Sequence, residues 1–320
     1  MKIGIFDPLF ASQPIEEMLD FVAASGCGAV EISCGRYPNN AHIDLDALLA
    51  DDGKVRDYKA LFTARGLEIS GLSCHGNPLH PNKEQARASD EIYRKTVALA
   101  QKLELQTVVC FSGCPGDSEG SKYPNWVTCP WPTEFLDILD WQWNTVAIPY
   151  WREAGQYAEG HNVRVAFEMH PGFLCYNPET MRRMSDAIGP VIGANVDPSH
   201  LFWQGIDPCQ AVRYLKGIVY YVHAKDTALH PYNIATNGVL DTKSYRDVAN
   251  RAWVFRSVGY GHDLLFWRQF VSALREVGFD GVLSIEHEDA LASSKEGFLK
   301  AVGTLKAAIF EESPGEMWWA

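Results

Sequence analysis

The chain alternates short apolar runs with longer segments in which apolar residues recur at the spacing of an α-helix. The runs predict eight β-strands, at residues 2–6, 28–33, 67–73, 107–111, 163–168, 192–197, 218–223 and 281–285. The amphipathic segments predict helices at residues 14–24, 55–65, 82–103, 134–159, 178–188, 207–215, 264–277 and 295–310. Strands that alternate with helices indicate an α/β fold with a parallel sheet.

This alternation continues through residues 1–320 with no break in composition, which predicts a single domain. Eight is the number of parallel strands that closes a (β/α)8 TIM barrel. A doubly wound open sheet is the alternative. The Gly-x-Gly-x-x-Gly loop typical of that fold does not follow the first strand, where Phe6-Asp7-Pro8-Leu9 stands instead. The pattern therefore favours the barrel.

Two predicted strand-to-helix connections are much longer than the others. Residues 112–132 follow the fourth strand and residues 227–261 follow the seventh, and both segments are rich in glycine and aromatic residues. Barrel enzymes keep their active sites in the connections at the carboxyl ends of the strands, so we expect these segments to act as lids. Their aromatic side chains suit stacking on sugar rings, and equally suit contacts between subunits.

The composition narrows the range of partners. The 28 Lys and Arg against 40 Asp and Glu give a formal charge of −12, which disfavours nucleic acid, because affinity for a phosphate backbone depends on clustered cations. No apolar run approaches membrane-spanning length, and no apolar leader precedes the first strand. The 8 cysteines are scattered without a Cys-x-x-Cys pair, as expected of reduced thiols in the cytoplasm. We therefore expect a cytoplasmic protein that binds neither nucleic acid nor membrane.

Four predicted strands run directly into carboxylate or imidazole side chains. Glu168, Asp197, His223 and Glu286 stand at the ends of the fifth, sixth, seventh and eighth strands. Parallel barrel strands present their carboxyl ends on one face, so we expect these side chains to meet there. Three carboxylates and an imidazole form a ligand set for one divalent metal ion, such as Mn²⁺, Mg²⁺, Co²⁺ or Zn²⁺. For Asp197, which precedes Pro198, capping of a helix is the alternative.

Further polar residues near the strand ends are candidates for substrate binding. They are His75, His170, His200, Asp226, Glu31 and Arg256. A side chain of this kind can instead orient a metal ligand or hold a loop. Glu31 lies within the second predicted strand, where an inward carboxylate needs a substrate hydroxyl or an ion pair as its partner. Arg256 stands in a glycine-rich aromatic segment, where it either binds an oxyanion or braces the lid.

Four motifs at these strand ends resemble those of a known family. They are Phe167-Glu-Met-His-Pro, Asn195-Val-Asp-Pro-Ser-His-Leu, Val222-His-Ala-Lys-Asp and Leu283-Ser-Ile-Glu-His. Over nearly its whole length the chain resembles the sugar isomerase/epimerase family with the xylose-isomerase-like TIM barrel, a superfamily that also includes inosose dehydratases and the endonuclease IV group. The resemblance implies that Glu168, Asp197, His223 and Glu286 hold one divalent metal. It also implies that Glu168 and Glu286 are the catalytic pair that transfers protons.

On this resemblance we expect a metal-dependent isomerase or epimerase of carbohydrate metabolism. It would move a proton beside the carbonyl of a ketose, keto-sugar or sugar phosphate through an enediolate. The alternatives are a lyase or C-glycoside deglycosidase that acts on a 3-keto-glycoside, and an inactive sugar-binding barrel. The long segment before Arg256 and the second histidine at His170 indicate a larger or differently shaped substrate than that of a plain ketose epimerase.

The same resemblance bears on assembly. Relatives are often dimers or tetramers, so we expect a homo-oligomer, and the aromatic tail at residues 317–319 is a candidate contact. A small companion subunit is expected only if the protein is a deglycosidase. An endonuclease like the endonuclease IV group is disfavoured, because the chain is acidic.

Overall fold

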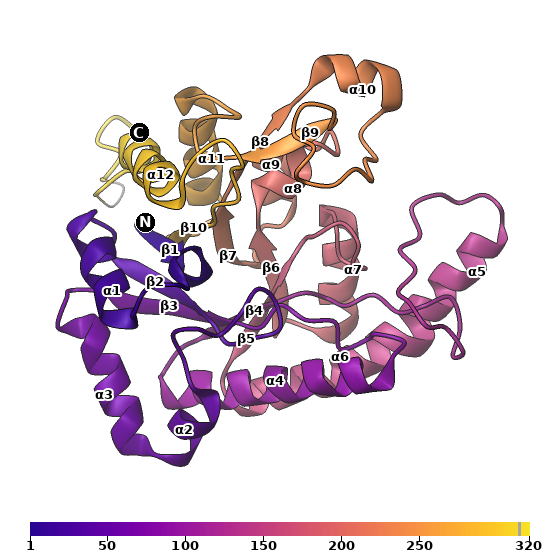
Figure 1. Ribbon diagram of the computed structural model, residues 1–320, viewed down its shortest axis with the longest axis horizontal. Coiled ribbons are helices and arrows are strands. Elements are labelled where there is room, and N and C mark those ends of the chain that lie inside the picture. The colour runs from indigo at the N-terminus through magenta and orange to yellow at the C-terminus, as the bar shows by residue number, and fades with distance from the viewer. Residues whose placement is uncertain (313–314) are drawn as a thin grey trace.

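A closed barrel of eight parallel strands forms the centre of the computed structural model, which describes residues 1–312 and 315–320. The order of neighbouring strands around the barrel is β1-β10-β7-β6-β5-β4-β3-β2, and β1 also pairs with β2. This arrangement confirms the predicted TIM barrel (Figure 1). The barrel strands are β1 (Lys2–Phe6), β2 (Ala29–Ser33), β3 (Glu68–Ser73), β4 (Thr107–Cys110), β5 (Arg164–Glu168), β6 (Ile192–Val196), β7 (Val219–Ala224) and β10 (Val282–Ile285).

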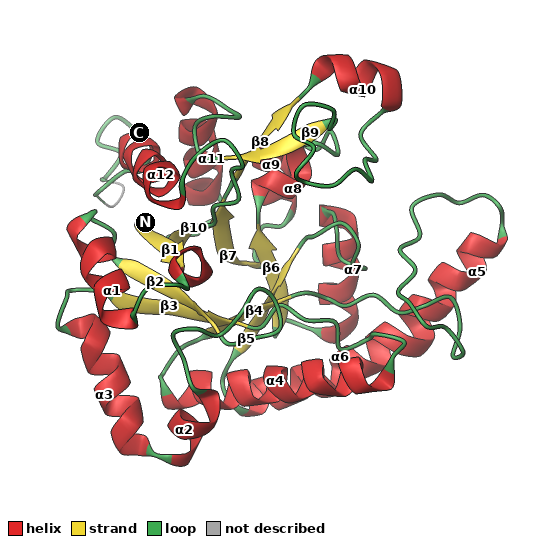
Figure 2. Ribbon diagram, in the orientation of Figure 1, coloured by secondary structure: helices red, strands yellow, loops and turns green. Residues whose placement is uncertain are grey.

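Helices surround the strands on the outside of the barrel (Figure 2). They bury one apolar face each, as α11 does with Trp267, Phe270 and Leu274. No helix in the described part of the chain is both long and apolar enough to cross a membrane. The main outer helices are α1 (Ile15–Ala24), α3 (Asp52–Thr63), α4 (Lys83–Lys102), α6 (Ile148–Gly160), α7 (Pro178–Ile188), α9 (Pro208–Tyr214), α11 (Leu264–Glu276) and α12 (Ser294–Ala308).

Some local structure differs from the prediction. The helix predicted at residues 134–159 consists of α5 (Glu134–Asp140), a π-helical segment at Trp141–Ala147, and α6. The change of geometry falls just before Pro149, which has no N–H to continue the regular ladder. Three short elements were not predicted because they are too brief for a periodic signal: a 3₁₀ turn at Asp7–Phe10, α2 (Leu45–Ala50) and α8 (Pro198–Phe202).

The segment after β7 is not the irregular loop that the sequence predicts. It contains an antiparallel strand pair, β8 (Asp226–Leu229) and β9 (Trp253–Arg256). Residues 230–252, which we call the arm, lie between these strands, include helix α10 (Pro231–Asn237) and project from the barrel (Figure 1). At its base, the ring of Trp253 stacks on the ring of Trp203 with centroids 4.8 Å apart. The arm is therefore a packed unit.

Asp226 fixes the base of the arm to the barrel. One of its carboxylate oxygens accepts hydrogen bonds from the backbone N–H groups of Gly259, Gly261 and His262, each at 3.0 Å. The other oxygen accepts from the N–H of Thr227 and lies 2.8 Å from the His262 ring. A Cβ atom on Gly261 would lie 2.4 Å from the Thr227 carbonyl oxygen, so the close approach requires glycine.

Candidate metal centre and active site

Glu168, Asp197, His223 and Glu286 meet at the carboxyl ends of β5, β6, β7 and β10, which are neighbours in the barrel. Each side chain offers one ligand atom, and these atoms all lie within 4.8 Å of one another. The first three residues are buried, and the Glu286 side chain is 17% exposed. The structure thus brings together all four residues that the sequence suggests as metal ligands.

Glu31 sets the orientation of His223 from the other side of the barrel. The Nε2 atom of His223 lies 3.0 and 3.1 Å from the two carboxylate oxygens of Glu31. A carboxylate only accepts, so His223 donates its Nε2 hydrogen to Glu31. Ser284 and Ser73 also donate their hydroxyls to Glu31. The carboxylate of Glu31 is therefore fully engaged within the barrel.

The opposite ring nitrogen of His223 faces two carboxylates. Its Nδ1 atom lies 3.4 Å from Glu168 Oε2 and 3.2 Å from Glu286 Oε2. Burial would lower the pKa of His223, but Glu31 and the other nearby carboxylates outweigh it and raise that pKa well above its usual value. Nδ1 has no well-oriented hydrogen bond to any described residue, so a cation fits this position better than a shared proton.

Two carboxylate oxygens of the cluster are also buried without a hydrogen-bond partner among the described residues. They are Asp197 Oδ2 and Glu286 Oε2. The second oxygen of Asp197 accepts the N–H of Ser199 at 2.8 Å and so caps α8, which means that Asp197 both caps a helix and presents a free oxygen to the cluster. Burial raises the pKa of Asp197 to about 6, against the opposing effects of Lys225 and of His200, whose Nε2 atom lies 3.3 Å from Asp197 Oδ2. The donor set therefore fits one divalent cation.

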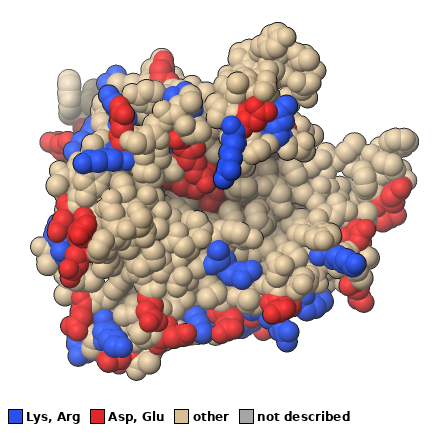
Figure 3. All heavy atoms as spheres, in the orientation of Figure 1, with Lys and Arg blue, Asp and Glu red and all other residues tan. Residues whose placement is uncertain are grey.

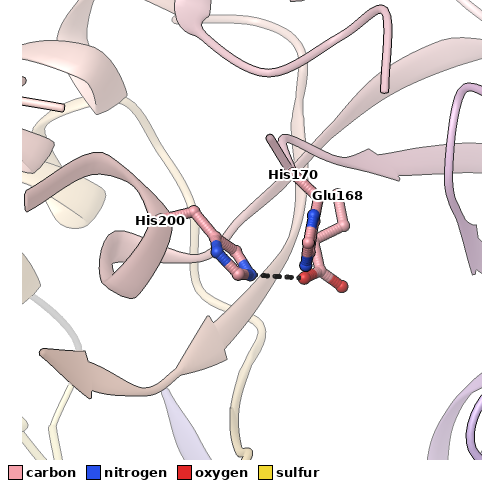
Figure 4. Close-up of side chains that lie close together, drawn as sticks. All are labelled: Glu168, His170 and His200. Carbon is pink, nitrogen blue, oxygen red and sulfur yellow. Dashed lines mark hydrogen bonds and ion pairs between the residues drawn. The ribbon is translucent and has the colours of Figure 1, made fainter. Parts of the chain in front are cut away.

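Histidines converge on the carboxylate of Glu168. His75 Nε2 lies 3.0 Å from its Oε2 atom, and His200 Nε2 lies 3.1 Å from its Oε1 atom. The His170 and His200 rings lie beside the Glu168 carboxylate, with ring centroids 4.0 Å apart (Figure 4). The Nδ1 atom of His170 lies 2.6 Å from the Pro171 carbonyl oxygen. Burial would raise the pKa of Glu168, but His200, His223 and His75 lower it well below its usual value.

Burial lowers the pKa of His170 to about 3, and the neighbouring His200 contributes to the shift. The His170 ring is therefore neutral at physiological pH. Glu168, His170 and His200 form a second group whose ligand atoms lie within 4.8 Å of one another. The structure thus places the predicted substrate contacts His75, His170 and His200 directly beside the proposed metal ligands.

Asp226 and Arg256, which the sequence also suggests as substrate contacts, are engaged elsewhere. Asp226 accepts the backbone hydrogen bonds at the base of the arm, as described above. Arg256 Nε donates to both carboxylate oxygens of Asp289, at 3.1 and 3.2 Å. Asp289 in turn accepts the N–H of Ser257 at 2.8 Å. In this structure both residues hold the chain around the site, as Glu31 holds His223.

Comparison with known proteins places the chain in a family. Residues 19–308 match the family described as xylose isomerase-like TIM barrel. The chain belongs to this family. It is 38% identical over 312 residues to the uncharacterized protein YfiH of Bacillus subtilis (strain 168), and the match covers 97% of this chain and 99% of YfiH.

Several solved structures share the xylose isomerase-like barrel. The probable 3-DHS dehydratase AsbF from Bacillus anthracis is 16% identical with a TM-score of 0.67, covering 96% of this chain and 99% of AsbF. A D-tagatose 3-epimerase-like protein is 20% identical with a TM-score of 0.62, and the match covers 96% of this chain and 98% of that protein's chain. The IolI protein with a bound zinc atom is 17% identical with a TM-score of 0.64, covering 96% of each chain. At such identities these structures establish the common fold.

Within this xylose isomerase-like barrel the sequence analysis missed Lys225. Its side chain is 2% exposed, and its Nζ atom lies 3.0 Å from Glu286 Oε1 and 2.5 Å from Glu288 Oε2. Nζ also lies 4.2 Å from the centre of the Phe255 ring. Burial would lower the pKa of Lys225, but Glu286 and Glu288 outweigh it and raise the pKa well above its usual value. Lysine is seldom buried, so position in the sequence alone gives little signal.

The cluster opens into a hollow on the surface of the barrel. Figure 3 shows acidic side chains gathered in the hollow at the middle of the face in view. A cavity of about 500 Å³ is lined by polar and by apolar residues. The polar residues include His170 and Glu288, and the apolar or aromatic residues include Tyr245, Val254 and Phe255. Glu286 lines a smaller adjoining cavity of about 290 Å³, so a substrate can reach this member of the cluster from solvent.

Proposed function

We propose that the protein is a divalent-metal-dependent enzyme that isomerises or epimerises a sugar or keto-sugar by proton transfer through an enediolate. The observation that carries this proposal is the arrangement of Glu168 and Glu286 on two sides of one imidazole nitrogen, His223 Nδ1. Glu286 lines a cavity of about 290 Å³, and Glu168 contacts His200, which lines the neighbouring cavity of about 230 Å³. Two carboxylates around one bound sugar can act as base and acid.

A divalent cation bound by the four-residue set supplies electrostatic stabilisation to the negative charge that develops on the carbonyl oxygen. Three carboxylates and one imidazole suit Mn²⁺, Mg²⁺, Co²⁺ or Zn²⁺. The zinc atom of the IolI structure makes zinc the first ion to test.

The protein groups divide the proton transfer between them. In the proposal, one of Glu168 and Glu286 removes a proton beside the carbonyl. Return of a proton by the other carboxylate to the opposite face gives the epimer, whereas return to the adjacent carbon gives the isomer. Lys225 holds one oxygen of Glu286, and the other oxygen, Oε2, faces the metal cluster beside His223 Nδ1. Its charge also keeps Glu286 ionised, as a base must be: burial would raise the pKa of Glu286, but Lys225 and His223 lower it well below its usual value.

The remaining predicted residues take two kinds of role in this proposal. His170 and His200 contact the substrate, because they line the cavity beside Glu168, and His75 is assigned the same role because it contacts the Glu168 carboxylate. Glu31, Asp226 and Arg256 act indirectly: Glu31 orients His223, and the other two hold the arm and its base.

A lyase is the second candidate. Loss of a group β to the carbonyl begins with the same proton removal, and the dehydratase AsbF is among the structures that share this fold. The D-tagatose 3-epimerase-like structure supports the first candidate in the same way. Release of water or of an alcohol would separate a lyase from an epimerase.

The proposal is tested by proton exchange in D₂O. The zinc- or manganese-loaded protein is incubated with a panel of ketoses and keto-sugars, and deuterium incorporation is followed by NMR. We expect deuterium beside the carbonyl of at least one compound, loss of exchange on chelation, and no exchange with Glu286→Gln. The matched control is Glu296→Gln, which alters an exposed glutamate on α12. Exchange at the wild-type rate in Glu286→Gln would refute the assignment.

A further inference from the structure

Two smaller cavities adjoin the main one beside the metal cluster. One, of about 290 Å³, shares His287, Glu288 and Ser294 with the main cavity. The other, of about 230 Å³, shares His170 and Tyr245 with it. A substrate that reaches Glu168 and Glu286 therefore has room on two further sides. The space exceeds what a single monosaccharide ring fills, because cavities of roughly 300–1,000 Å³ hold ligands of drug size.

The cavity next to His170 has aromatic walls. We call it the aromatic recess, and define it by Trp126, Trp203, Tyr245 and Trp253, with His170 and His200 at its inner end. Trp126 comes from the long segment after β4, whereas Tyr245 belongs to the arm and Trp253 follows it at the start of β9. The two long segments of the chain thus meet to build one recess beside the catalytic groups.

The walls of the aromatic recess are held in place by ring packing. Trp203 and Trp253 stack with ring planes 5° apart, and Trp126 meets Tyr176 edge to face with centroids 5.3 Å apart. The guanidinium carbon of Arg251 lies over the Tyr245 ring, 4.3 Å from the ring centre. Preordered aromatic faces bind a ring with little loss of conformational entropy.

Two indole N–H groups in the aromatic recess lack an acceptor. Trp126 Nε1 and Trp203 Nε1 are buried and have no hydrogen-bond partner among residues 1–312 and 315–320. By contrast, Trp253 Nε1 donates to the Val239 carbonyl oxygen at 3.0 Å. Trp203 is 5% exposed, so its N–H is not satisfied by bulk water. Neither N–H is accessible in this structure, so the contribution of the recess to ligand binding rests on its aromatic side chains.

The charges around the cavities disfavour a phosphate. No Lys or Arg is among the described residues that line any of the three cavities, whereas Glu286, Glu288, Asp289 and Asp241 are. Two buried cations lie nearby, and both are engaged: Lys225 is paired with Glu286 and Glu288, and Arg251, behind the Tyr245 and Trp253 rings, donates to the carbonyl oxygens of Trp253 and Lys243. A phosphoryl group placed here would meet carboxylates and no free cation.

We infer that the aromatic recess is a subsite for a second, uncharged ring of the substrate, so that the enzyme acts on a glycoside and not on a free or phosphorylated monosaccharide. The inference rests on the proposed function only for the location of the reacting sugar, at Glu168 and Glu286. The second ring lies against the aromatic side chains that line the recess.

Equilibrium binding tests this inference without any need for turnover. The probes are glucose, galactose and mannose, each as the free sugar, the 6-phosphate, the phenyl β-glycoside and a β-linked disaccharide, titrated calorimetrically into the zinc-loaded protein. We expect a two-ring probe to bind at least about tenfold more tightly than its free sugar, since one well-packed aromatic contact contributes about 1–2 kcal/mol. The 6-phosphates should bind no better than the free sugars.

Variants locate the effect. Trp126→Ala should weaken two-ring binding about tenfold and leave the binding of free sugars unchanged. Tyr245→Ala, which also alters the wall of the main cavity, should weaken two-ring binding about tenfold. The matched controls are Tyr123→Ala and Tyr232→Ala, which alter aromatic residues of the same two segments that are 77% and 83% exposed. Those controls should bind every probe as the wild type does.

Three outcomes would overturn the inference: tightest binding by a 6-phosphate, two-ring binding that both recess variants leave intact, or no binding by any two-ring probe. The proposed function fails separately, through the absence of deuterium exchange. Tight two-ring binding without deuterium exchange would therefore support the subsite and refute the enediolate chemistry. Deuterium exchange on free sugars, with two-ring binding unaffected in the recess variants, would support the chemistry and refute the subsite.

Discussion

Glu31→Gln should weaken binding of a divalent cation, although Glu31 is not one of the four proposed ligands. The carboxylate is fully buried and accepts the Nε2 hydrogen of His223 at 3.0 Å. Glutamine keeps an acceptor oxygen and nearly the same shape, so the substitution removes mainly the charge. It therefore tests whether Glu31 strengthens His223 as a ligand through electrostatics.

The expected size follows from the difference between charged and neutral hydrogen bonds. A hydrogen bond to a charged group contributes about 1.5–3 kcal/mol, against about 0.5–1.5 kcal/mol for a neutral one. A loss of about 1.4 kcal/mol corresponds to about tenfold weaker binding. This lies at the lower end of the roughly 10–100-fold loss seen when the partner of a metal-binding histidine is removed. Glu31→Ala, which removes both the charge and the acceptor, should approach the upper end.

The assay is competition for Zn²⁺ or Mn²⁺ against a fluorescent chelator, with a thermal melt to verify that each variant is folded. Glu68→Gln is the matched control, because Glu68 begins the adjacent strand β3 but is exposed and paired with Lys2. The control should bind the ion as the wild type does. Binding by folded Glu31→Gln within twofold of the wild type would refute the argument that Glu31 acts through His223.

Two further predictions concern charges near the site. Lys225→Met should destabilise the ion-free protein by about 3–5 kcal/mol in urea melts, because Glu286 would lose its buried partner. Saturating Zn²⁺ should recover part of that lost stability. An equal loss of stability with and without the ion would contradict this prediction. Asp241, in the arm, has its pKa lowered to about 2, since hydrogen bonds from the N–H groups of Lys243 and Ala252 outweigh the opposing effect of burial. A carboxylate whose pKa is lowered by folding stabilises the protein fully above its unfolded pKa of 3.8, and this stability is lost as the pH falls through about 2. The difference in unfolding free energy between the wild type and Asp241→Asn should therefore shrink as the pH falls from 3.8 to about 2. A pH-independent difference would show that Asp241 does not contribute through its charge.

The barrel could be predicted because its strands are covered on both faces and read as continuous apolar runs. The runs that end at Glu168 and before Asp197 match β5 and β6 closely. The arm could not be predicted in the same way. β8 and β9 have four residues each, and β8 begins with an aspartate whose role is to accept backbone hydrogen bonds. Such short strands carry no periodic signal.

The proposed metal ligands could be suggested from sequence because each lies at a strand end, and barrel geometry brings strand ends together. Their supports follow no such rule. Glu31 is 192 residues from His223 in the chain, and only the closed barrel places the two side by side. Lys225 stands next to β8 as an ordinary charged residue, and its burial between Glu286 and Phe255 appears only in three dimensions.

The way in which the arm leaves the barrel determines how freely this part of the chain can be exchanged. β8 and β9 run side by side, with Leu229 opposite Trp253, so the chain departs and returns at almost the same place. A two-residue turn could replace residues 230–252 without moving any strand of the barrel. The arm is thus an exchangeable module. A protein engineer can lengthen, shorten or replace it to change the cavities that Tyr245 lines, while Glu168 and Glu286 stay where the barrel puts them.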